Sequence, residues 1–203
     1  MIKKISEGAE ATIYEVRAQN CSLILKYRPA KGYRVKNLDN MLRARRTRVE
    51  ARALGAAHNI GVNVPLLRLV SKYGILTSMV KGSMLKDMLN RNSKLLNKTL
   101  REAGRHLAAL HSAGIVHGDY TPANIMVDGE TVYVIDFGLA SFTNSIEDKA
   151  LDLLLMKRSL SSAHFNSFME GYKALSNQSE VCRRLAEIER RGRYQTRTLI
   201  AKS

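Results

Sequence analysis

The chain has 203 residues, of which 45% are hydrophobic and 25% are charged. This length and composition suit one folded domain with a sizeable core, and they argue against disorder over the bulk of the chain. Its 33 Lys and Arg against 18 Asp and Glu give a formal net charge of +15, which favours a polyanionic partner. The alternative explanation of the charge is a solvated basic surface with no specific partner.

Neither the N-terminus nor the cysteines indicate export. Residues 1–5 carry two lysines and are followed by no apolar segment, unlike a signal peptide, and no apolar run approaches the about 20 residues that span a bilayer. Cys21 and Cys182 are far apart and lack metal-ligand spacing, which is typical of a reduced intracellular protein, and a disulfide between them stays open as an alternative. We expect a soluble, cytoplasmic protein with no membrane partner.

The first third of the chain predicts strands followed by a long helix. Segments rich in strand-forming residues alternate with turns up to Tyr27, and Pro29 and Gly32 then break the pattern. From Leu38 to Ala57 apolar residues recur at helical spacing, and most positions between them are Arg. A hairpin follows. The predicted strands are residues 2–6, 12–16, 22–27, 65–71 and 75–79.

The rest of the chain predicts helices and a second hairpin. Helical spacing covers residues 85–110, and Gly114 is typical of a helix C-cap. Asp128-Gly129 between two apolar segments is a strong hairpin signal, and helical spacing returns after it. We therefore expect one α+β domain, with a strand-rich N-lobe over residues 1–82 and a reduced helical C-lobe over residues 83–203.

A polar motif precedes the second hairpin. Residues 117–124 read His-Gly-Asp-Tyr-Thr-Pro-Ala-Asn, which matches the catalytic loop of protein kinases with Gly118 in place of Arg. Asp119 is the candidate catalytic base, because a carboxylate at this position can orient a nucleophile and accept its proton. Asn124 can turn back and ligate Mg²⁺, which prefers hard oxygen ligands.

A second motif, Asp136-Phe137-Gly138, follows the same hairpin. We expect the Asp136 carboxylate to bind the Mg²⁺ that bridges the nucleotide phosphates. The hairpin explains the spacing, because paired strands bring Asn124 and Asp136 to the same end. The alternative is two ordinary loops built from turn-forming residues. The two motifs in this order predict a protein-kinase-like fold that uses ATP and Mg²⁺.

The strand-rich lobe offers further ATP-binding candidates. Lys26, near the end of the third strand, is expected to pair with the nucleotide phosphates and with Glu50, the only acidic residue expected on the Arg-rich helical stretch. The alternative is a surface pair that contributes little. Ser78, Met79 and Val80, after the fifth strand, are expected to form a hinge that receives adenine through backbone groups.

The loop Glu7, Gly8, Ala9, Glu10 and Ala11 is expected to cover the phosphates with its backbone N–H groups. It keeps one glycine of the usual three and carries a carboxylate. Glu10 would repel phosphates unless Mg²⁺ or a basic side chain intervenes, so we expect a nucleotide grip that differs from that of ordinary protein kinases.

The chain departs from regulated protein kinases after these motifs. Gly118 replaces the Arg that pairs with a phosphorylated activation loop, and only a short stretch separates Gly138 from a predicted helix near Asp148, with no Ala-Pro-Glu triplet. We infer a site that is assembled constitutively. Asp152 is either an anchor for the catalytic loop or an ordinary helix-surface residue.

The C-terminal segment is basic. Its candidate contacts to RNA or to an acidic partner are Arg190, Arg191, Arg193 and Arg197, next to one aromatic residue. The alternative is a solvated helix end and a frayed tail.

Over nearly its whole length the chain resembles the small kinase/ATPase subunit of the KEOPS complex, the PRPK-type atypical kinases, in their archaeal stand-alone form. The Arg-rich block and the glutamate-bearing loop are the specific parts of this resemblance. Its residues are Glu7-Gly8-Ala9-Glu10-Ala11, Lys31-Gly32-Tyr33-Arg34, Leu38-Asp39, Arg46-Thr47-Arg48-Val49-Glu50-Ala51-Arg52, His117-Gly118-Asp119, Asn124, Asp136-Phe137-Gly138 and Glu147-Asp148-Lys149-Ala150-Leu151-Asp152, with the Arg-rich tail.

The resemblance implies an atypical Ser/Thr kinase that can autophosphorylate and acts largely as an ATPase. Such proteins support formation of threonylcarbamoyladenosine at adenosine 37 of tRNA, and they bind the threonylcarbamoyl-transferase subunit and a further small subunit. It also implies that Asp119 is the base, that Asn124 and Asp136 bind Mg²⁺, and that Lys26 with Glu50 holds the phosphates. Ser78 and Lys81 stand where many relatives have Glu.

Two other functions stay open from the sequence. A small-molecule kinase similar to aminoglycoside phosphotransferases would share the His-Gly-Asp motif, but those enzymes usually lack Asp-Phe-Gly and carry a larger helical lobe. A non-catalytic scaffold with a degenerate kinase fold would lack some of the ATP-handling residues, all of which are present in this chain.

Overall fold

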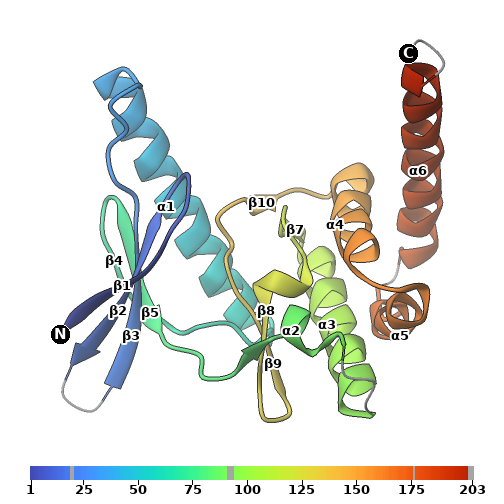
Figure 1. Cartoon of the computed structure of the whole chain (residues 1–203), viewed down its shortest axis with the longest axis horizontal. Coiled ribbons are helices and arrows are strands. Elements are labelled where there is room, and N and C mark those ends of the chain that lie inside the picture. Colours follow the sequence, from blue (N-terminus) through green and yellow to red (C-terminus); the bar gives the residue numbers. More distant parts are fainter. Residues whose placement is uncertain (19–20, 91–93, 176, 201–203) are drawn as a thin grey trace.

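The computed structural model describes residues 1–18, 21–90, 94–175 and 177–200, and for residues 18, 94 and 192–200 it describes the backbone only. A strand-rich half and a helical half lie side by side (Figure 1). The expected α+β architecture, with a strand-rich part followed by a helical part, is therefore present.

The strand-rich half is built on a five-stranded antiparallel sheet. β3 lies at its centre, where Lys26 is opposite Ile13 on one side and Ile75 on the other. Because alternate residues of a strand share a face, Ile24 and Lys26 point the same way. The strands are β1 (Ile2–Glu7), β2 (Thr12–Ala18), β3 (Cys21–Tyr27), β4 (Leu67–Val70) and β5 (Gly74–Ser78), in the spatial order β1-β2-β3-β5-β4. All five predicted strands are confirmed, with shifts of a few residues at their ends.

Helix α1 (Lys36–Asn59) packs against β4 and β5. Its last turns bury alanine and leucine side chains in the core, whereas its first turns bury charged side chains, with Arg43 donating to Asp39 at 2.7 Å. Asp39 is thus a second carboxylate on the Arg-rich helix, and the expectation that Glu50 is the only one is wrong. Internal ion pairs let this helix face inward in spite of its charge.

The second predicted hairpin is confirmed and forms part of a three-stranded sheet. The end of the catalytic-loop motif forms a 3₁₀ turn, η1 (Pro122–Asn124), which leads directly into the hairpin. A two-stranded sheet joins the segments before the first motif and after the second. The strands are β6 (Ser83–Met84), β8 (Ile125–Asp128) and β9 (Thr131–Val134), in the order β6-β8-β9, and β7 (Ile115–Val116) paired with β10 (Ser141–Phe142).

Helices make up the rest of the second half. Gly171 explains the close packing of α3 and α5, because a Cβ there would lie 1.8 Å from the carbonyl oxygen of Arg101. Ser145 caps α4 and Ser161 caps α5, each accepting a backbone N–H bond. The helices are α2 (Leu85–Met88), α3 (Lys94–Ser112), α4 (Ile146–Ser159), α5 (Ser162–Tyr172) and α6 (Gln178–Ile200).

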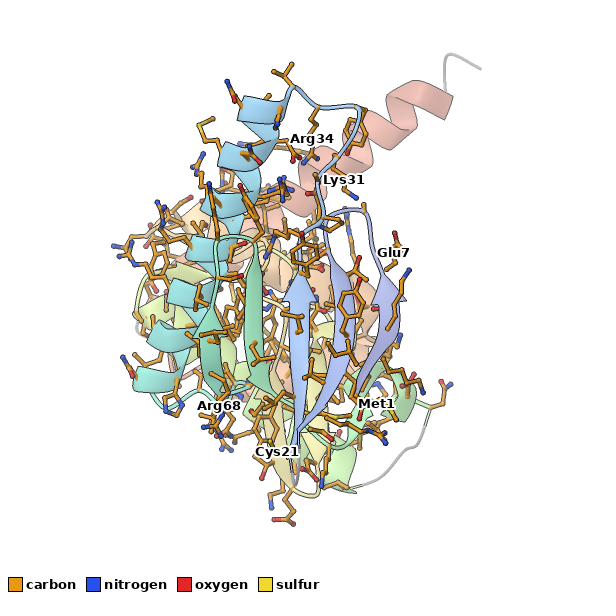
Figure 2. The ribbon with its side chains drawn as sticks, turned by 90° about the vertical axis from the view of Figure 1, so that its left-hand side faces the viewer. Met1, Glu7, Cys21, Lys31, Arg34 and Arg68 are labelled. Carbon is orange, nitrogen blue, oxygen red and sulfur yellow. The ribbon has the colours of Figure 1, made fainter. Side chains whose placement is uncertain are left out.

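Two expectations about the whole chain concern its cysteines and the membrane. No disulfide joins Cys21, at one end of the five-stranded sheet (Figure 2), to Cys182 on α6. Among the helices in the described ranges, none combines the length and the apolar character needed to cross a membrane.

Candidate active site

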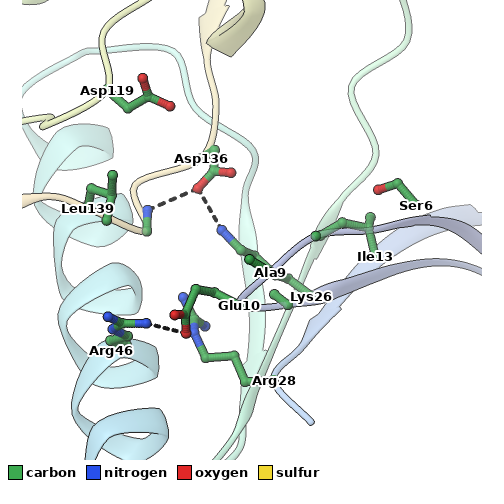
Figure 3. A pocket seen from close by; sticks show the side chains of 13 residues that line it. Ser6, Ala9, Glu10, Ile13, Lys26, Arg28, Arg46, Asp119, Asp136 and Leu139 are labelled. Carbon is green, nitrogen blue, oxygen red and sulfur yellow. Dashed lines mark hydrogen bonds and ion pairs between the residues drawn. The ribbon is translucent and has the colours of Figure 1, made fainter. Parts of the chain in front are cut away.

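Two adjoining cavities lie between the five-stranded sheet and the two sequence motifs, the catalytic loop and Asp-Phe-Gly. One, of about 400 Å³, has mostly apolar walls, and the other, of about 360 Å³, lies beside the loop at residues 8–11 (Figure 3). Both are lined by Ser6, Ile13, Lys26 and Asp136. A nucleotide could extend from the first to the second, so we call them the base cavity and the phosphate cavity.

The hinge candidates Ser78, Met79 and Val80 line the base cavity. The Ser78 N–H donates to the Leu66 carbonyl at 2.8 Å, and the Met79 N–H donates to the Ser22 carbonyl at 3.2 Å. No acceptor within the described residues takes the Val80 N–H. Of the three N–H groups, that of Val80 is therefore the one available to the edge of a purine.

Lys26 connects the two halves of the site. Its ammonium donates to Glu50 on α1 at 2.7 Å and to Asp136 at 2.6 Å. Glu50 also accepts from Arg28 at 2.5 Å, and the side chains of Glu50 and Arg28 are only 4% and 3% exposed. The predicted Lys26–Glu50 pair is present, and Arg28 adds a second cation that the sequence did not single out.

Asp136 adopts a backbone conformation that L-residues rarely take, with φ at 61°. The Gly138 N–H donates to its Oδ1 at 3.0 Å, beside the Lys26 bond to the same atom. Burial opposes ionisation of this carboxyl, but the Lys26 charge and these hydrogen bonds outweigh burial and lower its pKa. The unusual turn therefore holds an ionised carboxylate where the two cavities meet.

Asp119 and Asn124 form a small hydrogen-bonded unit at the catalytic loop. The Asn124 Nδ2 donates to the Asp119 carbonyl at 2.9 Å and to its carboxylate at 2.8 Å. Asp119 lines the phosphate cavity, and Asn124 lines the base cavity. The two residues that the sequence assigned to separate roles are thus in direct contact.

Asp152 anchors the catalytic loop from helix α4. Its fully buried carboxylate accepts the backbone N–H of His117 and that of Gly118, both at 2.8 Å. It also contacts His111 Nε2 at 3.2 Å, and His111 Nδ1 lies 2.7 Å from the Tyr172 hydroxyl. Of the two interpretations raised for Asp152, the anchor is confirmed.

Gly118 has a local structural reason. Its φ is +80°, and a Cβ at this position would lie 2.4 Å from the carbonyl oxygen of Leu139. The loop therefore packs against the segment after Gly138 so tightly that the Arg of regulated kinases would not fit at residue 118.

The loop at residues 8–11 is closed by the Gly8 N–H, which donates to the Ala11 carbonyl at 2.9 Å. Glu10 pairs with Arg46 and accepts from Arg34 at 3.0 Å. These partners, Arg46 first, lower the pKa of Glu10, so its charge is retained and compensated. Two basic side chains thus pair with the Glu10 carboxylate at the cavity wall, which meets the condition set from the sequence for a carboxylate in this loop.

Glu7 is the one loop candidate that the structure does not bring to the site. Its side chain is 59% exposed, pairs with Lys4, and lines neither cavity. By contrast, Gly8, Ala9, Glu10 and Ala11 all line the phosphate cavity.

Comparison with known proteins identifies the family. The model of the RIO domain matches residues 13–167. A serine/threonine-protein kinase BUD32 homolog of Archaeoglobus fulgidus is 37% identical, with 94% of this chain and 96% of the relative covered. The KEOPS complex subunit Bud32 of Pyrococcus abyssi is also 37% identical, with 98% and 99% covered. The chain belongs to the Bud32 family of RIO-domain kinases.

Other similar proteins are a longer relative and two solved structures of low sequence identity. A bifunctional tRNA threonylcarbamoyladenosine biosynthesis protein of Methanothermobacter thermautotrophicus is 39% identical, and the chain spans 36% of its length. The Rio2 kinase of Chaetomium thermophilum, solved as an ADP/Mg²⁺-phosphoaspartate complex, superposes with a TM-score of 0.63 at 17% identity, over 95% of this chain and 72% of its own. WaaP in complex with acyl carrier protein gives 0.66 at 18%, over 95% and 88%. At these identities the structures show the fold alone.

The donor set of this Bud32-family site suits Mg²⁺ bound together with phosphates. The hydrogen bonds to Asp136 are accepted by its Oδ1, and those from Asn124 are donated by its Nδ2. The other oxygens, Asp136 Oδ2 and Asn124 Oδ1, accept no hydrogen bond from residues in the described ranges. No cluster of three or more His, Cys, Asp or Glu that could hold a metal occurs among those residues. Few protein oxygens plus nucleotide phosphates is the arrangement that Mg²⁺ prefers.

The segment after Gly138 is short, as predicted. Only residues 139–145 separate it from α4, and they include β10. In this segment Phe142 lies under the guanidinium of Arg52, 4.1 Å from ring centre to Cζ. Arg52 closes the Arg-rich block by which the sequence resembled the Bud32 family, and the contact ties α1 to the catalytic half.

The basic C-terminal candidates lie apart from the cavities. Arg190 and Arg191 are exposed on α6. The structure describes only the backbone of Arg193 and Arg197. Helix α6 packs against α4 and stands on the far side of the helical half from the five-stranded sheet (Figure 1).

Proposed function

We propose that this chain transfers the γ-phosphoryl group of ATP, mainly to water, as the kinase/ATPase subunit of a KEOPS complex that supports threonylcarbamoyladenosine formation in tRNA. The observation that carries this is the convergence of Lys26, Glu50, Asp119, Asn124 and Asp136 on two joined cavities. The names of two relatives that are matched over nearly their full length, and of a longer bifunctional relative, support the biological setting.

Each residue has a chemical role on this proposal. The carboxylate of Asp119 orients the acceptor and takes its proton, and Asn124 fixes that carboxylate while offering its amide oxygen to Mg²⁺. Asp136 is the second Mg²⁺ ligand. Lys26, held by Glu50, binds phosphate oxygens, and bound Mg²⁺ would neutralise charge on the phosphates.

The acceptor is water, with autophosphorylation of a Ser or Thr as a secondary activity. The seven residues between Gly138 and α4 leave little chain for a peptide-docking platform. The segment is also fixed against Gly118 and Arg52. Water needs no platform, so this geometry favours hydrolysis.

The partners follow from the same assignment. They are the threonylcarbamoyl-transferase subunit, a further small subunit, and tRNA directly or through the complex, in the cytoplasm. The net charge of +15 favours contact with a polyanion, with Arg190, Arg191, Arg193 and Arg197 as candidates. Residues 1–82 and 83–203 act as the two lobes that enclose the nucleotide.

The test is ATP turnover by purified protein, alone and with the transferase subunit and tRNA. We expect stimulation by these partners and loss of at least about a hundredfold in kcat for Asp119→Ala and for Asp136→Ala, since each removes a group that acts in phosphoryl transfer. Asp128→Asn, on the exposed hairpin turn, is the matched control and should retain turnover.

Three outcomes would contradict the proposal. Unchanged hydrolysis in both alanine variants would exclude this site as the source of activity. No turnover by the wild-type protein with all partners present would favour a scaffold. Faster transfer to a small hydroxylated compound than to water or protein would favour a small-molecule kinase.

A further inference from the structure

Arg46 occupies an unassigned position in the phosphate cavity. It lies one helical turn before Glu50 on α1, so both side chains project from the same face of the helix toward the cavities. Its guanidinium side chain is 36% exposed, and Figure 3 shows it reaching from α1 to Glu10. It is therefore a solvent-reachable cation on the wall of the cavity that holds Asp119 and Asp136.

The other cations near this cavity already have several partners. Lys26 is held by Glu50 and Asp136, and Arg28 is buried against Glu50. Arg34 lies between Glu10 and Asp39, 3.0 and 3.7 Å from their carboxylates. Arg46 is held by Glu10, and no other ion pair to it occurs among the described residues.

Glu10 has two arginine partners, so it does not depend on Arg46. If Arg46 leaves, Arg34 still neutralises the carboxylate. A guanidinium can also bind a phosphoryl group through two parallel hydrogen bonds. A bound phosphoryl group can therefore compete with the Glu10 carboxylate for Arg46. Exchange of Arg46 from Glu10 to an entering phosphate thus leaves the partly exposed Glu10 carboxylate paired with Arg34.

We propose that Arg46 is a phosphate-binding residue that moves from Glu10 to the γ-phosphoryl group of bound ATP, while Arg34 keeps Glu10 paired. This inference rests on the proposed function. Glu10 then acts as a competitor that holds Arg46 in place when the γ-phosphoryl group is absent, which explains why a carboxylate is present in a phosphate-covering loop. Arg46 also places a positive charge beside the equatorial oxygens of the transferred group, over which charge is spread in the transition state.

The competing explanation is a fixed latch, in which the Glu10–Arg46 pair only holds the loop closed. The two explanations predict different signs for two variants. Loss of either partner opens a latch, so Arg46→Gln and Glu10→Gln would weaken ATP binding alike. If Arg46 moves from Glu10 to the phosphate, Arg46→Gln removes a group that binds phosphate. Glu10→Gln then removes the carboxylate that competes with phosphate for Arg46.

The experiment measures the dissociation constants of ATP and of ADP, each with Mg²⁺, by calorimetry, and compares their ratio. For Arg46→Gln we expect the preference for ATP over ADP to fall about tenfold, the size of one charge-assisted hydrogen-bonded pair. For Glu10→Gln we expect the preference to stay or to rise. Arg45→Gln, exposed on the same helix and outside the cavity, is the control.

The possible results distinguish failure of the Arg46 proposal from failure of the proposed function. An ATP preference that does not fall in Arg46→Gln, or that falls in both Arg46→Gln and Glu10→Gln, overturns the role of Arg46. A wild-type protein that binds neither nucleotide overturns the proposed function and this inference with it. Binding of both nucleotides with an unaltered ratio in every variant overturns the inference alone.

Discussion

At the scale of single residues, the carboxylate of Glu50 is shared by two cations, Lys26 and Arg28. Lys26 has a second carboxylate in Asp136, but Arg28 is 3% exposed and depends on Glu50 for its charge partner. We expect Glu50→Gln to lower the free energy of unfolding by about 3 kcal/mol, because it leaves a buried charge without compensation. Urea unfolding of the two proteins measures this difference.

The matched control is Glu7→Gln, which removes a carboxylate that pairs with Lys4 at the exposed surface. Exposed pairs contribute little, so the change there should stay below about 1 kcal/mol. Equal stability losses in the two variants would show that burial of Glu50 does not set its contribution.

The sequence predicts some of these residues and misses others for a physical reason. Asp119, Asn124 and Asp136 lie within one loop and one hairpin, so local spacing suffices to bring them together. Arg46 stands four residues before Glu50, a spacing that places both on one face, and this signal could have found it. The contact of His111 with Asp152 depends on how α3 and α4 pack, which no local pattern encodes.

At the scale of secondary-structure elements, α1 is coupled to the segment after the Asp-Phe-Gly motif by the stacking of Arg52 on Phe142. The contact links α1, the helix that carries Glu50, to this segment through two side chains and without a phosphate group. We expect Arg52→Ala and Phe142→Ala each to raise KM for ATP about twofold to fivefold, the range of an exposed cation–π contact. Steady-state ATPase kinetics with both variants check this.

The double variant distinguishes coupling from independent effects. If the two side chains act through their mutual contact, Arg52→Ala combined with Phe142→Ala should raise KM no further than either alone. Arg48→Ala, exposed on the same helix, should leave KM unchanged. Fully additive effects of the two substitutions would contradict the coupling.

At the scale of the whole molecule, the order of strands and helices was predictable because the hydrophobic period changes clearly between segments. Which charged residues are buried inside the fold could not be predicted in this way. Helix α1 buries Asp39, Arg43 and Glu50 beside its alanines, so a pattern based on apolar residues alone cannot tell which face is inward. Part of this inward face is defined by the ion pairs of Glu50 with Lys26 and Arg28, which are long-range contacts.

Histidines set a property of the whole fold, its response to acid. His106, His111 and His117 are buried in the helical half, and burial lowers the pKa of each. In the unfolded chain histidine takes up a proton near pH 6.5, whereas the folded protein resists this until a lower pH. The stability that these residues contribute is therefore complete above about pH 6.5 and is lost as the pH falls below it.

We expect the free energy of unfolding, measured by urea titration between pH 7.5 and 5.5, to decrease with falling pH. Each buried histidine contributes at most about 1.4 kcal/mol per pH unit. Because the Tyr172 hydroxyl and the Asp152 carboxylate suit neutral His111, with Nδ1 accepting and Nε2 donating, His111→Gln should destabilise the protein at pH 7.5 yet flatten the decrease. His58→Gln, exposed at the end of α1, should keep the wild-type slope. A slope in His111→Gln as steep as in the wild type would mean that protonation of this buried network does not drive the loss of stability.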